Sequence, residues 1–314
     1  MSAQHVEVPI PAPKEKQVLI KVEATSLNPI DWKTQKGILW PILPGKFPHI
    51  PSTDVAGKIV EVGAEVKTLK EGDNVVAKLT NTDGGGLAEF AVAEERLTVV
   101  RTPEVSAAEG ASLPVAALSA HQALTQLAAI NFHGSTGGGG QPKNILVTAA
   151  SGGVGHYAVQ LAKLGNAHVT ATCGARNIDL VRSLGADEVL DYRTPEGAAL
   201  KSPSGRKYDV VLNCAIGISW STFDANLTKE GMVIDFTPTP FSMMVSAMRK
   251  LVSKKQLIPL ILKPKRQHLD YLVNLVKNGK LKTVIDSKYS LSKAEFAWEK
   301  SIDGHATGKI IVEP

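Results

Sequence analysis

The chain has 314 residues, of which 43% are hydrophobic, and this length and composition suit an ordinary globular protein of two domains. Its 35 lysines and arginines exceed its 30 acidic residues by only five, and it has no basic tract with interleaved aromatic residues. Composition therefore does not argue for nucleic-acid binding. Two cysteines, Cys173 and Cys214, are too few for a zinc ribbon or a disulfide framework and indicate reduced thiols in a reducing compartment.

The first hundred residues are rich in short β-prone runs that are separated by Gly, Pro and Asp, which predicts a small barrel-like domain. The runs cover residues 18–28, 55–63, 74–79 and 87–93. The opening HVEVPIPAPKEKQ already resembles the approach to a strand, so we expect that a first strand is missing.

The pattern changes at Ser106, where SAAE predicts a capping box and a helical region follows to about Leu127. The glycine-rich linker at residues 133–140 precedes a strand instead of following one, which favours a surface loop over a phosphate-binding loop.

The segment NILVTAASGGVG, residues 144–155, predicts a strand, a glycine turn and the start of a helix. Such a turn lets backbone N–H groups at the helix start meet a pyrophosphate. Ala150 stands at the first position of the glycine fingerprint, so a tight turn without a ligand is the alternative. Further strands at residues 167–173, 188–192, 208–214 and 232–236 continue the alternation and favour dinucleotide binding. The expected contacts in the turn are Ser151, Gly152, Gly153, Val154 and Gly155.

The run QLIPLIL, residues 256–262, contains Pro259, which suits a sheet edge where a second subunit could continue the sheet. Residues 243–262 are too often interrupted by Arg and Lys to span a bilayer. The apolar face with Met244 and Met248 would suit an anionic membrane surface, although core or dimer packing is favoured. After Pro264 come two amphipathic helices, the second with a predicted capping box at residues 292–295, and then a closing strand that should return to the first domain.

AASGGVG, SLNPIDWKTQKG, IPSTDVAGKIVEVG and HATGKIIV together resemble the zinc-independent quinone/enone reductase branch of the medium-chain dehydrogenases/reductases. The resemblance implies a Rossmann-like, doubly wound parallel sheet domain inserted in a β-rich GroES-like substrate domain. The implied domains are residues 1–118 with 264–314 for substrate and 119–263 for the cofactor. The resemblance also implies a chloroplast location, peripheral at the inner envelope.

Alcohol dehydrogenases of this superfamily carry a zinc-binding cysteine where Asn28 stands, and a His-Glu pair where Thr53 and Asp54 stand. An amide and a hydroxyl are poor zinc ligands, so we expect no metal. Without a Lewis acid, alcohol oxidation is disfavoured.

NAD-preferring sites place an acid near the end of the second strand, where this chain has Gly174. Arg176 could pair with a 2′-phosphate instead, although it could also be an exposed cation at a helix start. Tyr192 matches a family tyrosine that contacts the same phosphate. The sequence therefore favours NADPH over NADH.

By resemblance, Asn28, Asp31 and Lys33 border the crevice between the domains, Ser119 lies near the nicotinamide, and Ile216 lies in a loop beneath it. Asn28 and Lys33 are the candidate catalytic residues, and Asp31, Ser119 and Ile216 are candidate cofactor contacts. Asn28 before Pro29 could equally serve only a turn, and Lys33 could simply be solvated. The proton donor remains open.

The implied chemistry is hydride transfer from the nicotinamide to the β-carbon of an α,β-unsaturated ketone, such as a long-chain enone or ketol, or to a quinone. The alternative is a non-catalytic NADPH-binding protein at a membrane or in a complex.

Overall fold

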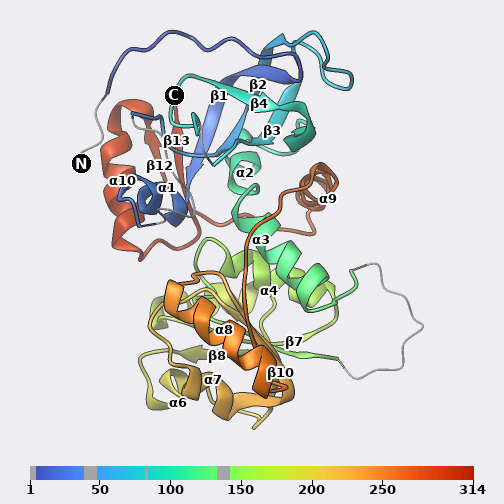
Figure 1. The fold of residues 1–314 in the computed structure, drawn as a ribbon, viewed down its shortest axis with the longest axis vertical. Helices are drawn as coiled ribbons and strands as arrows, with labels where there is room; N and C mark the ends of the chain where they lie inside the picture. The colour runs from blue at the N-terminus through green and yellow to red at the C-terminus, as the bar shows by residue number, and fades with distance from the viewer. Residues whose placement is uncertain (1–4, 39–47, 82–83, 133–141) are drawn as a thin grey trace. The chain divides into compact units, whose positions relative to one another are not determined.

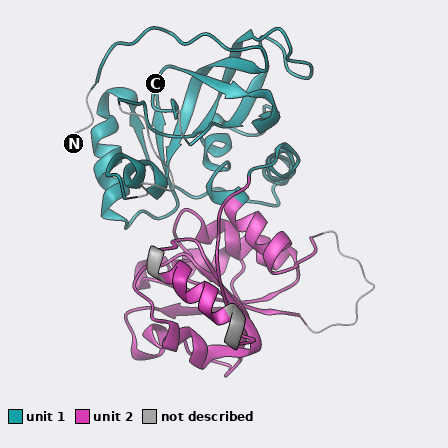
Figure 2. Ribbon diagram, in the orientation of Figure 1, with its two compact units in different colours: residues 1–118, 264–314 teal, residues 119–263 magenta. Residues whose placement is uncertain are grey.

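The computed structural model describes residues 5–38, 48–81, 84–132 and 142–314, so the predicted loop at residues 133–140 lies outside it. The chain divides into two compact units, which are coloured separately in Figure 2. Unit 1 comprises residues 1–118 and 264–314, and unit 2 comprises residues 119–263.

Unit 1 is built on a seven-stranded sheet in which the long strand β1 (Gln17–Leu27) pairs antiparallel with three others. Its partners are β2 (Asp54–Val62), β4 (Phe90–Glu94) and the last strand of the chain, β13 (Lys309–Glu313). The closing strand thus returns to the N-terminal sheet, as predicted. The remaining strands are β3 (Asn74–Lys78), β5 (Thr98–Val100) and β12 (Ile285–Ser290), which runs parallel to β13.

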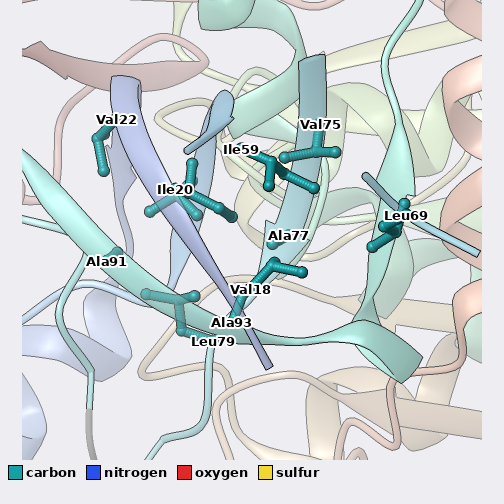
Figure 3. Packing of buried hydrophobic residues seen from close by; sticks show 11 residues of the cluster. Val18, Ile20, Val22, Ile59, Leu69, Val75, Ala77, Leu79, Ala91 and Ala93 are labelled. Carbon is teal, nitrogen blue, oxygen red and sulfur yellow. The ribbon is translucent and has the colours of Figure 1, made fainter. Parts of the chain in front are cut away.

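The core of unit 1 follows from alternation along β1. Val18, Ile20 and Val22 occupy every second position and therefore point to one face of the sheet, where all three are buried. They pack with Ile59 and Val75 from the neighbouring strands (Figure 3). β-Branched side chains are well suited to such a pleated, buried surface.

The helices of unit 1 include α1 (Pro29–Gln35), α2 (Ala107–Ser112), α9 (Arg266–Lys277) and α10 (Ala294–Asp303). α3 (Ala116–Gln122) continues in a π-helical turn, Ala123–Leu127, so the helical region predicted after Ser106 is present but interrupted. The capping box of α2 is confirmed, because Ser106 Oγ accepts from the Glu109 backbone N–H and the Glu109 carboxylate accepts from that of Ser106.

The capping box predicted at residues 292–295 is wrong. A 3₁₀ turn, Leu291–Lys293, leads directly into α10, so that Lys293 takes the N-cap position. The Ser292 hydroxyl instead lies 2.8 Å from the Ser290 hydroxyl. The helix ends, as its sequence suggests, at Gly304 in the left-handed conformation.

Unit 2 contains a six-stranded parallel sheet in the order β11-β10-β9-β6-β7-β8. Strands β7, β8 and β10 of this sheet are labelled in Figure 1. The chain enters the sheet at β6, continues to one side through β7 and β8, and then crosses to the other side at β9. This reversal makes the boundary between β6 and β9 a topological switch point. The strands are β6 (Asn144–Val147), β7 (His168–Cys173), β8 (Glu188–Asp191), β9 (Tyr208–Asn213), β10 (Leu227–Asp235) and β11 (Gln256–Pro259).

Helices alternate with these strands, which is the doubly wound α/β pattern that the sequence predicted. They are α4 (Gly155–Leu164), α5 (Ile178–Ser183), α6 (Pro195–Ala198), α7 (Trp220–Asn226) and α8 (Pro240–Val252). Pro259 ends the edge strand β11, as expected of a proline at a sheet edge. Across the described parts of the chain, we find no helix with both the length and the apolar character needed to cross a membrane.

Candidate functional site

The glycine turn after β6 has the geometry of an anion-binding loop. Ala149 adopts a left-handed conformation with φ 47°, and α4 begins at Gly155 without a side-chain cap on its N-terminus. A Cβ atom on Gly155 would lie 2.3 Å from the Ala149 carbonyl oxygen, so only glycine fits there. The start of α4, which no side chain caps, is suited to a phosphate group because the helix dipole attracts negative charge there.

The other residues predicted for this turn are also in it. Ser151 is buried, with 9% of its surface exposed, and its hydroxyl accepts a hydrogen bond of 3.0 Å from the Asn177 side chain. Gly152 is less constrained than Gly155, because a Cβ there would meet the Ala149 oxygen at 3.2 Å. Gly153 and Val154 complete the turn before the helix. Sequence reasoning missed Asn177, which links the turn to the segment after β7.

The end of β7 brings together the residues predicted to choose the coenzyme. A Cβ on Gly174 would lie 3.5 Å from the Tyr192 ring, so the two residues are neighbours although they follow different strands. Arg176 is exposed in the 3₁₀ turn Ala175–Asn177 that begins beside them. Arg193, which the sequence analysis overlooked, places its guanidinium 5.6 Å from the Tyr192 ring centre. This surface therefore offers two arginines and an exposed tyrosine to an anionic group.

Two further predicted residues belong to unit 2. Ser119 is buried in α3, with 6% of its surface exposed. Ile216 lies in the loop after β9 and is 81% exposed, more than any other large hydrophobic residue that the structure describes. Gly217, which follows it, has a φ of 81°.

In unit 1, Asn28 precedes α1 and is held on every side. Its backbone N–H donates to Asp31 Oδ2 at 2.8 Å, and its side-chain Nδ2 donates to Asp54 Oδ2 at 2.9 Å. Its Oδ1 accepts a hydrogen bond of 2.6 Å from the Lys309 ammonium. Asn28 is only 3% exposed, so its amide is occupied by the protein's own groups.

Two buried lysines and two buried aspartates make this region an ionic cluster, which we call the unit 1 charge cluster: Asp31, Asp54, Lys78 and Lys309, each at most 5% exposed. Burial raises the pKa of the Asp31 carboxyl to about 7. This value already includes a smaller raising effect of the neighbouring Asp54 charge and the opposing effects of the Asn28 N–H and the two ammonium groups. Burial also lowers the pKa of both lysines, and the two aspartates oppose that shift.

The sequence did not single out either lysine of this cluster. Lys309 begins the apolar strand β13, and Lys78 ends the apolar strand β3, so each resembled an ordinary strand terminus. Lys78 donates to the Leu79 carbonyl and to Asn81 Oδ1, both at 2.8 Å. Only tertiary contacts reveal that these ammonium groups are buried.

Lys33 lies in α1 with a half-buried side chain, its ammonium 5.7 Å from the centre of the Trp32 ring. Unit 1 also carries an open groove of about 1440 Å³ along β4, lined by residues such as Val8, Ile50 and Phe90. None of the residues that the sequence predicted for a site lines this groove.

The groups around Asn28 do not fit a zinc ion. Zinc in proteins is held by thiolate, imidazole or carboxylate ligands, whereas Asn28 presents an amide that is already bonded to an ammonium group. A lysine ammonium beside the position would repel a divalent cation. Among the described residues, no three His, Cys, Asp or Glu side chains are grouped so that they could hold a metal.

The chain matches two protein-family models: "Alcohol dehydrogenase GroES-like domain" over residues 14–104 and "Zinc-binding dehydrogenase" over residues 184–312. It is 67% identical to the chloroplast envelope quinone oxidoreductase homolog of Arabidopsis thaliana, covering 99% of this chain and 94% of that protein. The NADPH-dependent alkenal/one oxidoreductase, chloroplastic, of the same plant is 34% identical, covering 97% of this chain and 74% of that protein.

Among solved structures, the quinone oxidoreductase from Coxiella burnetii superposes with a TM-score of 0.87 at 30% sequence identity. The match covers 98% of this chain and 94% of that one.

Proposed function

Because the chain belongs to the quinone oxidoreductases of the medium-chain dehydrogenase/reductase superfamily and is an oxidoreductase with a nicotinamide cofactor, we propose that it is a zinc-independent NADPH-dependent reductase. Its proposed acceptors are α,β-unsaturated ketones, such as long-chain enones or ketols, or quinones. The observation that carries this proposal is the glycine turn between β6 and the uncapped start of α4, together with the ends of β7 and β8, where Arg176 and Tyr192 stand in place of an acid.

The bound cofactor would supply the hydride, and the protein would bind, orient and protect it. The residues of unit 2 fit this role, since Gly155 lets the backbone of the turn pack closely against the start of α4, where a pyrophosphate can bind. Arg176 can bind a 2′-phosphate through its planar guanidinium, and Tyr192 lies beside Gly174, two residues before Arg176. An aspartate at Gly174 would instead favour the free ribose hydroxyl of NADH.

The unit 1 charge cluster supports zinc independence, because the Lys309 ammonium in it donates a hydrogen bond to the Asn28 amide. A positive charge is thereby built into the fold where the related alcohol dehydrogenases hold a metal. We retain Asn28 and Lys33 as substrate-side residues of the proposal. The complete engagement of Asn28 supports a role in holding α1 and the cluster in place, and Lys33 offers an ammonium group outside the cluster.

Asp31, Ser119 and Ile216 remain proposed residues on the nicotinamide side. The high exposure of Ile216 supports this role, because an aliphatic side chain left in solvent is suited to covering an apolar ring face.

We also propose that the protein acts in the chloroplast, peripherally at the inner envelope, and that β11 can pair with a second subunit. The chloroplastic relatives support the first part. On α8, Met244 is 53% and Met248 is 60% exposed, which supports surface contact better than core packing. The edge position of β11 supports the second part.

The test is oxidation of NADPH, with NADH alongside, by the purified chain against a panel of long-chain enones, ketols and quinones. We expect turnover with a preference for NADPH. Arg176→Ala should lower kcat/KM for NADPH by about tenfold or more, the size of a lost charge-assisted contact, and leave that for NADH nearly unchanged.

Arg182→Ala, which removes an exposed arginine of α5, is the matched control and should change neither value. A preference for NADH would contradict the assignment of the coenzyme. Tight NADPH binding without turnover of any acceptor would favour the non-catalytic alternative.

A further inference from the structure

A chain of buried polar side chains crosses the carboxyl ends of three neighbouring strands of unit 2. Thr148 follows β6, Asn213 ends β9 and Asp235 ends β10. They are 0%, 6% and 6% exposed, respectively. Buried polar groups cost free energy unless they are hydrogen-bonded, so their arrangement at one edge of the sheet requires a specific set of partners.

The hydrogen bonds among these three side chains all donate toward Asp235. The Thr148 hydroxyl donates to Asn213 Oδ1 at 2.9 Å, and Asn213 Nδ2 donates to Asp235 Oδ1 at 3.2 Å. The backbone N–H of Thr237 also donates to this carboxylate oxygen, at 3.0 Å. Because an ionised carboxylate can only accept, it fixes which end of the Asn213 amide faces it, and the amide in turn fixes where the Thr148 proton points.

Because the Thr148 hydroxyl donates its proton to Asn213, the lone pairs of its oxygen accept hydrogen bonds from the loop after β9. Two consecutive backbone N–H groups donate to it, that of Cys214 at 2.9 Å and that of Ala215 at 3.2 Å. The loop then presents the exposed Ile216 and turns at Gly217 with a positive φ. The buried Thr148 hydroxyl therefore holds the start of this loop, at residues 214 and 215.

The loop after β9 lies at the topological switch point of the sheet. Thr148 and Asn213 stand at the ends of β6 and β9, the two strands that flank the topological switch point of the sheet. Ligands of open α/β sheets bind outside the carboxyl ends of the strands at that point. The glycine turn before α4 lies at the same end of β6 and is suited to the phosphates, which leaves the loop after β9 for another part of the same ligand.

We propose that Thr148, Asn213 and Asp235 form a positioning chain, which holds residues 214–217 to receive the nicotinamide end of the coenzyme while the glycine turn holds its phosphates. This inference rests on the proposed function, because it assigns one end of the coenzyme to each loop. None of the three residues needs to touch the coenzyme. They act through the backbone of the loop.

The experiment compares two ligands by isothermal titration calorimetry: NADPH, and 2′-phospho-ADP-ribose, which keeps the phosphates but lacks the nicotinamide. Thr148→Val keeps the shape of the side chain and removes both the donor and the acceptor. We expect it to weaken NADPH binding about tenfold, as the loss of ordered hydrogen bonds implies, and to leave the ring-free ligand bound as in the wild type. Thr148→Ser, which restores the hydroxyl, should bind NADPH like the wild type.

Asn213→Leu provides a second route, because it removes both links between Thr148 and Asp235 and should produce the same selective loss even if Thr148→Val does not fold. Equal weakening of both ligands, or no change in either, would overturn the positioning role while the wild type still bound NADPH. A wild-type protein that bound neither ligand would overturn the proposed function and this inference with it.

Discussion

Replacing Asp31 with asparagine tests whether the unit 1 charge cluster holds a carboxyl group whose pKa is raised to about 7. Asp31 is 5% exposed, and burial raises its pKa from 3.8 to about 7. The shift is about three units, and each unit corresponds to about 1.4 kcal/mol of difference between the protonated and ionised forms. Ionised Asp31 should therefore cost the folded state about 4 kcal/mol relative to protonated Asp31.

The sign of the pH dependence follows from proton linkage. Below pH 3.8 the carboxyl is protonated in the folded and the unfolded chain, and the stabilisation from its buried, protonated form is fully present. Between that pH and about 7 the unfolded chain loses the proton first, so the stabilisation declines as pH rises. Above pH 7 it is lost. Asparagine does not titrate and can still accept the bond from the Asn28 N–H.

We therefore expect the stability of Asp31→Asn relative to the wild type to increase by about 4 kcal/mol between pH 4 and pH 8. Urea unfolding followed by circular dichroism at several pH values measures this difference. A difference that stayed constant with pH, or that moved against the variant as pH rose, would refute the raised pKa of Asp31.

Asp187→Asn is a control whose stability relative to the wild type should change with pH in the opposite direction. Although burial alone would raise its pKa, hydrogen bonds from Lys163 and from the Val169 N–H lower the pKa of Asp187. The contribution of this carboxylate is present above pH 3.8 and is lost as pH falls through its lowered folded-state pKa. This variant should therefore lose stability relative to the wild type at pH 8.

Gly155→Ala should weaken NADPH binding about tenfold or more and lower stability by about 1–3 kcal/mol, because its Cβ would lie 2.3 Å from the Ala149 oxygen. Gly152→Ala, whose Cβ would lie 3.2 Å from the Ala149 oxygen, should weaken binding and lower stability less than Gly155→Ala does. Calorimetry measures the binding and thermal unfolding the stability, and equal effects of the two variants would contradict the geometry. Lys309→Met should cost about 3 kcal/mol in urea unfolding, because it leaves buried charges and the Asn28 amide without their partner. Lys288→Met, which removes an exposed ion pair between β12 and β13, should cost about 1 kcal/mol or less, and a similar loss in both variants would argue against the buried cluster.

Much of unit 2 could be predicted because its signals are local. The apolar run at residues 145–147, the small residues of the turn and the spacing of Val154, Tyr157, Ala158 and Leu161 are set within twenty residues of one another. Strand and helix follow from such spacing whatever the rest of the chain does. The pairing of Ser106 with Glu109 was predictable for the same reason, whereas that at Ser292 failed because a 3₁₀ turn displaced the helix start by one residue.

The coenzyme surface was predictable only in part. Gly174 and Arg176 follow one strand and could be read together, and Tyr192 entered through the family resemblance. Arg193 and Asn177 were missed because no local sequence pattern marks either residue. Arg193 contributes by its contact with the Tyr192 ring, and Asn177 by its hydrogen bond to Ser151.

The sequence by itself determined which segments become strands and helices, where the glycine turn lies and which residue types follow it, because these depend on the few residues next to one another. Only the tertiary structure decided that Lys309 bonds to Asn28, a partner 281 positions away, and that Thr148, Asn213 and Asp235 form one chain. The physical reason is that hydrogen bonds and ionic contacts depend on distance in space and on burial. Neither quantity exists until the sheets have formed and have brought the ends of their strands together.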